Sequence, residues 1–94
     1  IVKYMNNKIW ETRKMKEEIL LDNIDKVHTT KMGIDRIIKN LDIHNIDPVQ
    51  YCKNLISEKN CNIYRKGKNL YCEINNIKIT INATSYTIIT AHKI

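Results

Sequence analysis

The sequence is poor in the residues that build special loops and aromatic cores. Its 94 residues include no phenylalanine, one tryptophan, two glycines and one proline. Two isolated glycines exclude a glycine-rich phosphate loop, and no apolar run reaches the roughly 20 residues that a membrane-spanning helix needs. Hydrophobic residues still form 43% of the chain, which suffices for one aliphatic core. We therefore expect a single domain over 15–94, preceded by an N-terminal extension over 1–14.

Cysteine occurs three times, at spacings that do not suit a metal site. Cys52, Cys61 and Cys72 are separated by eight and ten residues, so no C-x-x-C pair marks half of a zinc site. An odd number of cysteines without a secretory signal favours buried thiols in a reducing cytoplasm. The Asp, Glu and His spacings suggest no divalent-metal centre either. We expect a cytoplasmic protein with no metal, no cofactor and no membrane partner.

Positive charge exceeds negative charge along the chain. Sixteen Lys and Arg against ten Asp and Glu give a formal net charge of +6. Such a chain is attracted to polyanions, because each cation placed on a phosphate releases a counterion. Nucleic acid is the first partner to consider, but small basic proteins need not bind it, so charge alone does not decide the partner.

Hydrophobic periodicity predicts helices in the first part of the chain. Apolar residues recur at helical offsets through 2–24, and a second helix follows Thr29 or Thr30 as its N-cap. Asp47 as N-cap and Pro48 at the first helical position predict a third helix. The apolar stripe of the second helix comprises Ile34, Ile37, Ile38 and Leu41.

After residue 60 the apolar period shortens to two, which predicts strands. The connections between them are short and rich in turn formers, so consecutive strands should pair as an antiparallel meander. The predicted fold is therefore α+β, with about three N-terminal helices packed on one face of a four-stranded antiparallel sheet. The predicted strands cover 61–66, 69–74, 77–82 and 86–93.

Strand alternation separates a core face from a polar face. Ile77, Ile79 and Ile81 share the core face. The opposite face is basic and aromatic, which suits unpaired RNA because bases stack on tyrosines while cations hold the backbone. Ordinary cross-strand tyrosine pairs would give the same pattern. The candidate RNA-binding residues are Lys39, Tyr64, Lys66, Lys68, Tyr71 and Lys78, and Glu73 shares the polar face.

The last predicted strand carries isoleucine on both faces, which predicts a central position in the sheet. We expect Ile89 and Ala91 to face the core, because a small side chain lets a helix approach closely. That orientation places Thr90 and His92 on the polar face.

Two histidine clusters carry most of the chemical signal. His28 precedes the second helix, whose dipole favours a neutral imidazole, and Arg36 follows eight residues later. Metal-free RNA cleavage needs a base, an acid and cations around the phosphorus. We assign His28 as the base or the acid and Arg36 and Lys68 as phosphate clamps. Thr90 and His92 complete the catalytic set on the last strand. His28 is equally compatible with a surface position beside an N-cap.

Four motifs resemble a small bacterial family of unknown function over residues 15–94. They are HTTKMGIDRI at 28–37, YCK at 51–53, RKGKN at 65–69 and SYTIITAHK at 85–93. A looser similarity links His28, Arg36 and Thr90 to positions in the barnase-like and RelE-like toxin ribonucleases, which place helices before an antiparallel sheet. This resemblance implies a metal-independent endoribonuclease or a ribonuclease-like toxin.

The expected partners are RNA and, for a toxin, a cognate antitoxin or another acidic protein. Two other interpretations stay open. The chain can be a nucleic-acid-binding module without catalysis, or an inhibitor or regulator that binds protein through 1–14.

Overall fold

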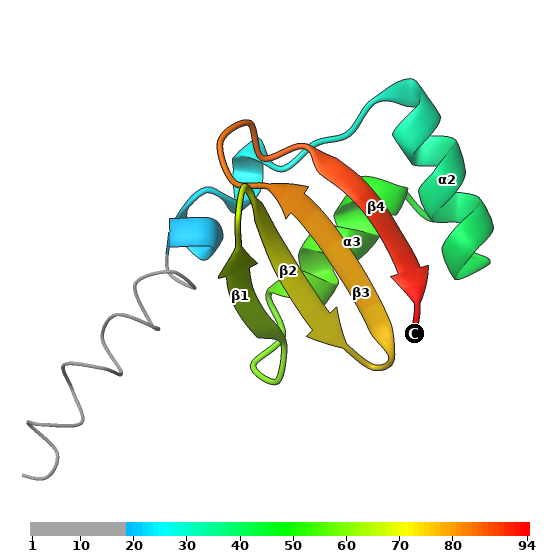
Figure 1. Ribbon diagram of the computed structural model, residues 1–94. Helices are drawn as coiled ribbons and strands as arrows, with labels where there is room; N and C mark the ends of the chain where they lie inside the picture. Colours follow the sequence, from blue (N-terminus) through cyan, green and yellow to red (C-terminus); the bar gives the residue numbers. More distant parts are fainter. Residues whose placement is uncertain (1–18) are drawn as a thin grey trace, which may run out of the picture.

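The computed structural model describes residues 19–94, in which helices precede a four-stranded antiparallel sheet (Figure 1). This α+β arrangement confirms the predicted fold class. The predictions for the extension over 1–14 and for most of the first helix lie outside the described residues. Residues 19–22 are helical, and the elements that follow are η1 (Ile24–Lys26), α2 (Lys31–Leu41), α3 (Pro48–Ile56), β1 (Asn62–Lys66), β2 (Asn69–Ile74), β3 (Ile77–Asn82) and β4 (Ile88–Lys93).

Side-chain caps begin α2 and α3 where the sequence predicts them. Thr30 Oγ1 accepts a hydrogen bond from Gly33 N at 3.0 Å, which fixes Thr30 rather than Thr29 as the N-cap. Asp47 Oδ1 accepts from Val49 N at 3.0 Å. Each cap satisfies a backbone N–H that has no partner within its helix.

The sheet has the order β1-β2-β3-β4 with every pair antiparallel, which is the predicted meander. Gly67 (φ 64°) makes the β1–β2 turn, and Asn75 (φ 51°) and Asn76 (φ 62°) make the β2–β3 turn. These residues tolerate the left-handed backbone that tight hairpins require.

The core lies between the sheet and the two helices. Ile79 and Ile81 are fully buried on the sheet side, and Ile37, Cys52 and Ile56 are buried on the helices. In Figure 1, α3 crosses behind the strands and α2 lies beside β4. The opposite face of the sheet, called the open face below, is left uncovered by these helices.

The prediction for β4 was wrong in two respects. β4 is an edge strand rather than a central one. Its register with β3 shifts between Thr80 and Ile81, and this β-bulge leaves Ile89 without a direct partner. Ile88 therefore enters the core at 2% exposure, whereas Ile89, expected inside, is 41% exposed.

Beyond the bulge the predicted orientation of β4 is confirmed. Ala91 is fully buried, and the α2 helix packs along this strand. Thr90 and His92 therefore lie on the open face, opposite Thr80 and Lys78 of β3.

The three cysteines are buried, as expected. Burial raises the pKa of the Cys52 thiol from its ordinary value of 9.0 to about 12. A hydrogen bond with Cys61, together with burial, raises the pKa of Cys72. Both groups are therefore neutral thiols at physiological pH. Within residues 19–94, no helix is long and apolar enough to cross a membrane.

Candidate functional site

Cross-strand pairing arranges the open face in parallel rows of side chains. The tyrosine row runs across all four strands, because Tyr64 pairs with Tyr71, Tyr71 with Thr80 and Thr80 with Thr90. The neighbouring row, called the acid–base row below, contains Glu73, Lys78 and His92, in that order from β2 to β4. Side chains two residues apart along a strand share a face, so the two rows project together.

The tyrosine row begins with two stacked aromatic rings. The ring centroids of Tyr64 and Tyr71 are 5.4 Å apart, with an angle of 21° between the ring planes. The Lys78 ammonium lies 4.8 Å from the centre of the Tyr71 ring, within cation–π range. A cation and an aromatic surface therefore meet at the centre of the open face.

A hydrogen bond connects the two rows. The Tyr64 hydroxyl donates to Glu73 Oε2, and this bond raises the pKa of Tyr64 because it stabilises the protonated hydroxyl. Tyr64 is thus held as a donor, and it orients the carboxylate. The second carboxylate oxygen has acceptor capacity of its own.

The acid–base row holds a carboxylate, an ammonium and an imidazole on three adjacent strands. Neighbouring strands lie roughly 4.8 Å apart, so the Cα atoms of Glu73 and His92 are about 10 Å apart with Lys78 between them. All three residues are half-buried. Their side chains can therefore surround a phosphate group that rests on Lys78.

His28 lies away from this row, beside the residues that lead into β4. Its backbone pairs with Thr87, donating from its N–H to Tyr86 O at 3.1 Å and accepting from Ile88 N at 2.7 Å. Thr87 is five residues before His92. At the rise of an extended strand, the Cα atoms of Thr87 and His92 are about 16 Å apart, and His28 lies beside Thr87. His28 and His92 are therefore too far apart for both to act on one phosphate.

The His28 imidazole is engaged locally. Its Nδ1 lies 2.8 Å from Lys26 O, which places the proton on Nδ1, and its Nε2 lies 3.2 Å from Thr87 Oγ1. Thr87 Oγ1 is in turn 2.8 Å from Ser85 Oγ. The HTT and SYT motifs thus meet, although at Thr87 rather than at Thr90 or His92.

Thr29, the second residue of the HTT motif, also holds this segment against the start of β4. Thr29 Oγ1 donates to Ile88 O at 2.9 Å, and a Cβ at Gly33 would overlap with that same hydroxyl. Gly33 therefore lets the first turn of α2 approach β4 closely.

The remaining predicted cations fall into two groups. Arg36 and Lys39 are exposed on α2, which belongs to the helical side of the molecule. Lys66 ends β1 and Lys68 lies in the following turn, and both are exposed. Lys66 pairs with Asn69, one row beyond the tyrosine row, so it shares the open face whereas Arg36 and Lys39 do not.

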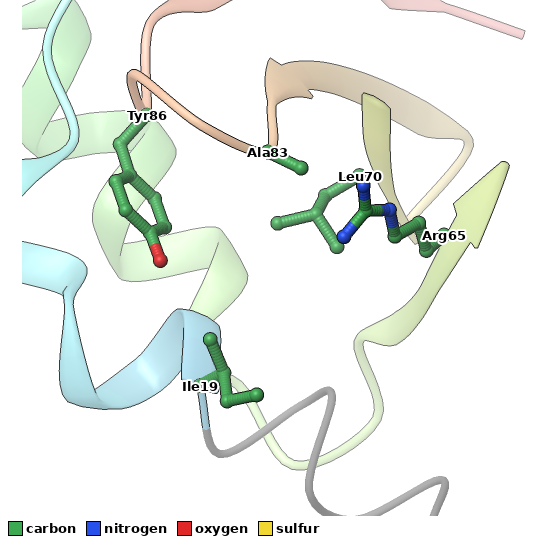
Figure 2. Close-up of a pocket in the computed structure, with 5 residues that line it drawn as sticks. All are labelled: Ile19, Arg65, Leu70, Ala83 and Tyr86. Carbon is green, nitrogen blue, oxygen red and sulfur yellow. The ribbon is translucent and has the colours of Figure 1, made fainter. Parts of the chain in front are cut away.

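A small pocket lies on the helical side of the sheet rather than on the open face. It has a volume of about 50 Å³ and combines the Tyr86 ring with the guanidinium of Arg65 (Figure 2). Drug-sized ligands occupy pockets of roughly 300–1,000 Å³, so this pocket does not suit one. Its lining residues are Ile19, Arg65, Leu70, Ala83 and Tyr86.

Sequence reasoning placed Glu73 on the polar face but gave it no chemical role. The signal was the two-residue turn at Asn75 and Asn76, which sets Ile74 opposite Ile77 and hence Glu73 opposite Lys78. Among residues 19–94 no group of three or more His, Cys, Asp and Glu side chains is placed to hold a metal ion.

One family comparison bears on this chain. The model of the family described as "Protein of unknown function (DUF3781)" matches residues 21–92, which include both rows of the open face. No curated protein and no solved structure matches the chain.

Proposed function

Because the chain belongs to the DUF3781 family of proteins of unknown function, its activity has to be inferred from its own residues, and we propose that it is a metal-independent endoribonuclease acting on the open face of the sheet. The observation that carries this proposal is the acid–base row, in which Lys78 stands between Glu73 and His92. This assignment gives the base role to Glu73 instead of a histidine, leaves His28 out of the site and gives the acid role to His92.

The proposed reaction is an in-line transfer at phosphorus. The Glu73 carboxylate takes the proton of the ribose 2′-hydroxyl, whose oxygen attacks the adjacent phosphorus. The His92 imidazolium donates a proton to the departing 5′-oxygen, and Lys78 stabilises the negative charge of the phosphorane. The P–O5′ bond breaks, which leaves a 2′,3′-cyclic phosphate and a free 5′-hydroxyl.

The spacing of the row supports this geometry. Attacking and leaving oxygens lie on opposite sides of phosphorus in an in-line transfer, and each needs its base or acid within about 2.6–3.2 Å. Base and acid must therefore flank the phosphate rather than touch each other. Two residues separated by one intervening strand, with a cation on that strand, meet this requirement.

Binding of the RNA chain would rest on the same face. Unpaired bases stack on the Tyr64–Tyr71 pair. Successive rows are about 6.7 Å apart along a strand, so Lys66 on β1, two rows from Lys78, lies about 13 Å away along the strands and can hold a phosphate upstream of the reacting one.

The test is cleavage of a single-stranded RNA in EDTA, followed by analysis of the new ends. We expect cyclic phosphate ends from the wild type and a loss of about 100-fold or more for Glu73→Gln and for His92→Ala, since general acid–base groups contribute on the order of 10²–10⁴. Circular dichroism and thermal unfolding of each variant report whether it is folded. Absence of wild-type cleavage, or cleavage by both variants at the wild-type rate, contradicts the proposal.

A second candidate is RNA binding without turnover. The stacked tyrosines with Lys78 and Lys66 support it directly, since stacking and phosphate contacts require no acid or base. Salt-dependent RNA binding by a wild type that does not cleave would establish this candidate instead.

A further inference from the structure

The aromatic surface lies at one end of the acid–base row and is absent from the other end. Tyr64 and Tyr71 stand on β1 and β2, and the Tyr64 hydroxyl is bonded to Glu73. β4, which carries His92, contains no Phe, Tyr or Trp from Ile88 to Lys93. Tyr86 precedes β4 but lines the pocket on the helical side of the sheet.

This asymmetry distinguishes the two nucleotides that flank a scissile phosphate. The general base that deprotonates the 2′-hydroxyl stands beside the nucleotide on the 5′ side, because the ribose of that nucleotide supplies the attacking oxygen. The acid stands beside the nucleotide on the 3′ side, because that ribose supplies the leaving oxygen. Glu73 and His92 therefore mark the two directions of the RNA chain along the row.

From this we infer that Tyr64 and Tyr71 form a subsite for the base of the nucleotide on the 5′ side of the cleaved bond, an inference that rests on the proposed ribonuclease function. Tyr71 covers one face of the Tyr64 ring, so an unpaired base stacks on the other face. Its ribose then comes next to the carboxylate that the Tyr64 hydroxyl orients.

Stacking also sets the kind of selectivity. Every nucleobase offers a π-face, so a stacking subsite requires a base without requiring a particular one. The nucleotide on the 3′ side meets His92 and Thr90, neither of which provides an aromatic ring of comparable size. Its base should contribute little to the rate.

The experiment uses DNA oligonucleotides that contain one ribonucleotide, so that one linkage can be cleaved. In the first substrate the ribonucleotide keeps its 2′-hydroxyl but carries hydrogen in place of its base. In the second, the deoxynucleotide on the 3′ side of the linkage lacks its base. We expect kcat/KM to fall tenfold or more for the first substrate, and to change less than threefold for the second.

Variants of Tyr64 connect the effect to the subsite. Tyr64→Phe keeps the ring but loses the hydroxyl that orients Glu73, so it is the reference variant and should retain the preference for a nucleobase on the 5′ side. Compared with Tyr64→Phe, Tyr64→Leu should have a kcat/KM at least tenfold lower on the parent oligonucleotide and nearly equal on the base-free ribonucleotide substrate. A general structural defect would instead lower kcat/KM on all three substrates equally.

The outcomes separate the two claims. Failure of the wild type to cleave the parent oligonucleotide overturns the proposed function and the subsite with it. Cleavage that depends on the 3′ base as much as on the 5′ base, or a Tyr64→Leu variant that remains sensitive to loss of the 5′ base, overturns the subsite alone.

Discussion

The hydroxyl of Tyr64 donates a hydrogen bond to the carboxylate of Glu73, and this bond joins the two rows of the open face. One tyrosine therefore presents a ring for stacking and fixes the carboxylate to which we assign the proton transfer. The bond forms between adjacent strands whose register places Tyr64 opposite Tyr71 and Glu73 opposite Asn62. Stacking of a nucleobase on Tyr64 and proton transfer to Glu73 are thus coupled through the hydrogen bond between β1 and β2.

His92 as the general acid predicts that a better leaving group will rescue its removal. His92→Ala should lose about 100-fold or more on RNA, yet less than tenfold on a ribonucleoside 3′-(p-nitrophenyl phosphate), because nitrophenolate departs without a proton. Glu73→Gln should be impaired on both substrates. His44→Ala is the matched control, since His44 is exposed and bonded to Asp42 at 3.1 Å. Equal losses of His92→Ala on both substrates would remove the acid role.

Lys66 on the open face and Lys68 in the turn that follows it should contribute to the salt dependence of RNA binding. Each phosphate contact with a single strand contributes about 0.7 to the slope of log K against log salt concentration. Replacing Lys66 and Lys68 by Gln should therefore lower that slope by about 1.4. Lys39→Gln removes a charge on α2 and should leave it unchanged. Fluorescence anisotropy in a salt series measures both, and a larger effect of Lys39 would place RNA on the helical side.

Gly33→Ala should destabilise the fold by roughly 1–3 kcal/mol, because the new methyl overlaps with Thr29 Oγ1 and forces α2 away from β4. The free energy of unfolding in urea measures the loss. Asn40→Ala, an exposed position on the same helix, is the control and should be neutral or slightly stabilising. If Gly33→Ala is as stable as Asn40→Ala, Thr29 does not determine the docking of α2.

Stability should decline at alkaline pH because of Cys52. Its folded pKa of about 12 lies above the ordinary 9.0, so between these values the unfolded chain releases a proton that the folded chain keeps. The contribution is fully present below pH 9, and is lost as pH rises at up to about 1.4 kcal/mol per pH unit. Urea unfolding at pH 8 to 10.5 should show a shallower decline for Cys52→Ala than for the wild type. Parallel curves would contradict the assignment.

The local parts of this fold were predictable, since local chemistry determines them. Thr30 and Asp47 cap helices through bonds to residues two or three positions away. The Asn75–Asn76 turn sets the β2–β3 register by itself. In each case the interacting atoms are separated by a few residues, so residue type and spacing are sufficient.

The parts that failed depend on contacts distant in sequence. The bulge at Ile89 follows from fitting β4 against both β3 and α2, and alternation alone cannot reveal it. His28 reaches Thr87 across 59 residues, and no periodicity links them. Glu73, Lys78 and His92 line up only because of the β2–β3 register and the β3–β4 register together. From the sequence, Glu73 is therefore indistinguishable from an ordinary polar-face residue.

The central claim is that the reacting phosphate lies over Glu73, Lys78 and His92 rather than beside His28. The most direct test compares Glu73→Gln with His28→Gln on one RNA in EDTA, under single-turnover conditions, with RNA affinity measured in parallel. We predict that Glu73→Gln cleaves about 100-fold more slowly with affinity retained, and that His28→Gln stays within threefold of the wild type. Slow cleavage by His28→Gln beside normal cleavage by Glu73→Gln would contradict this account.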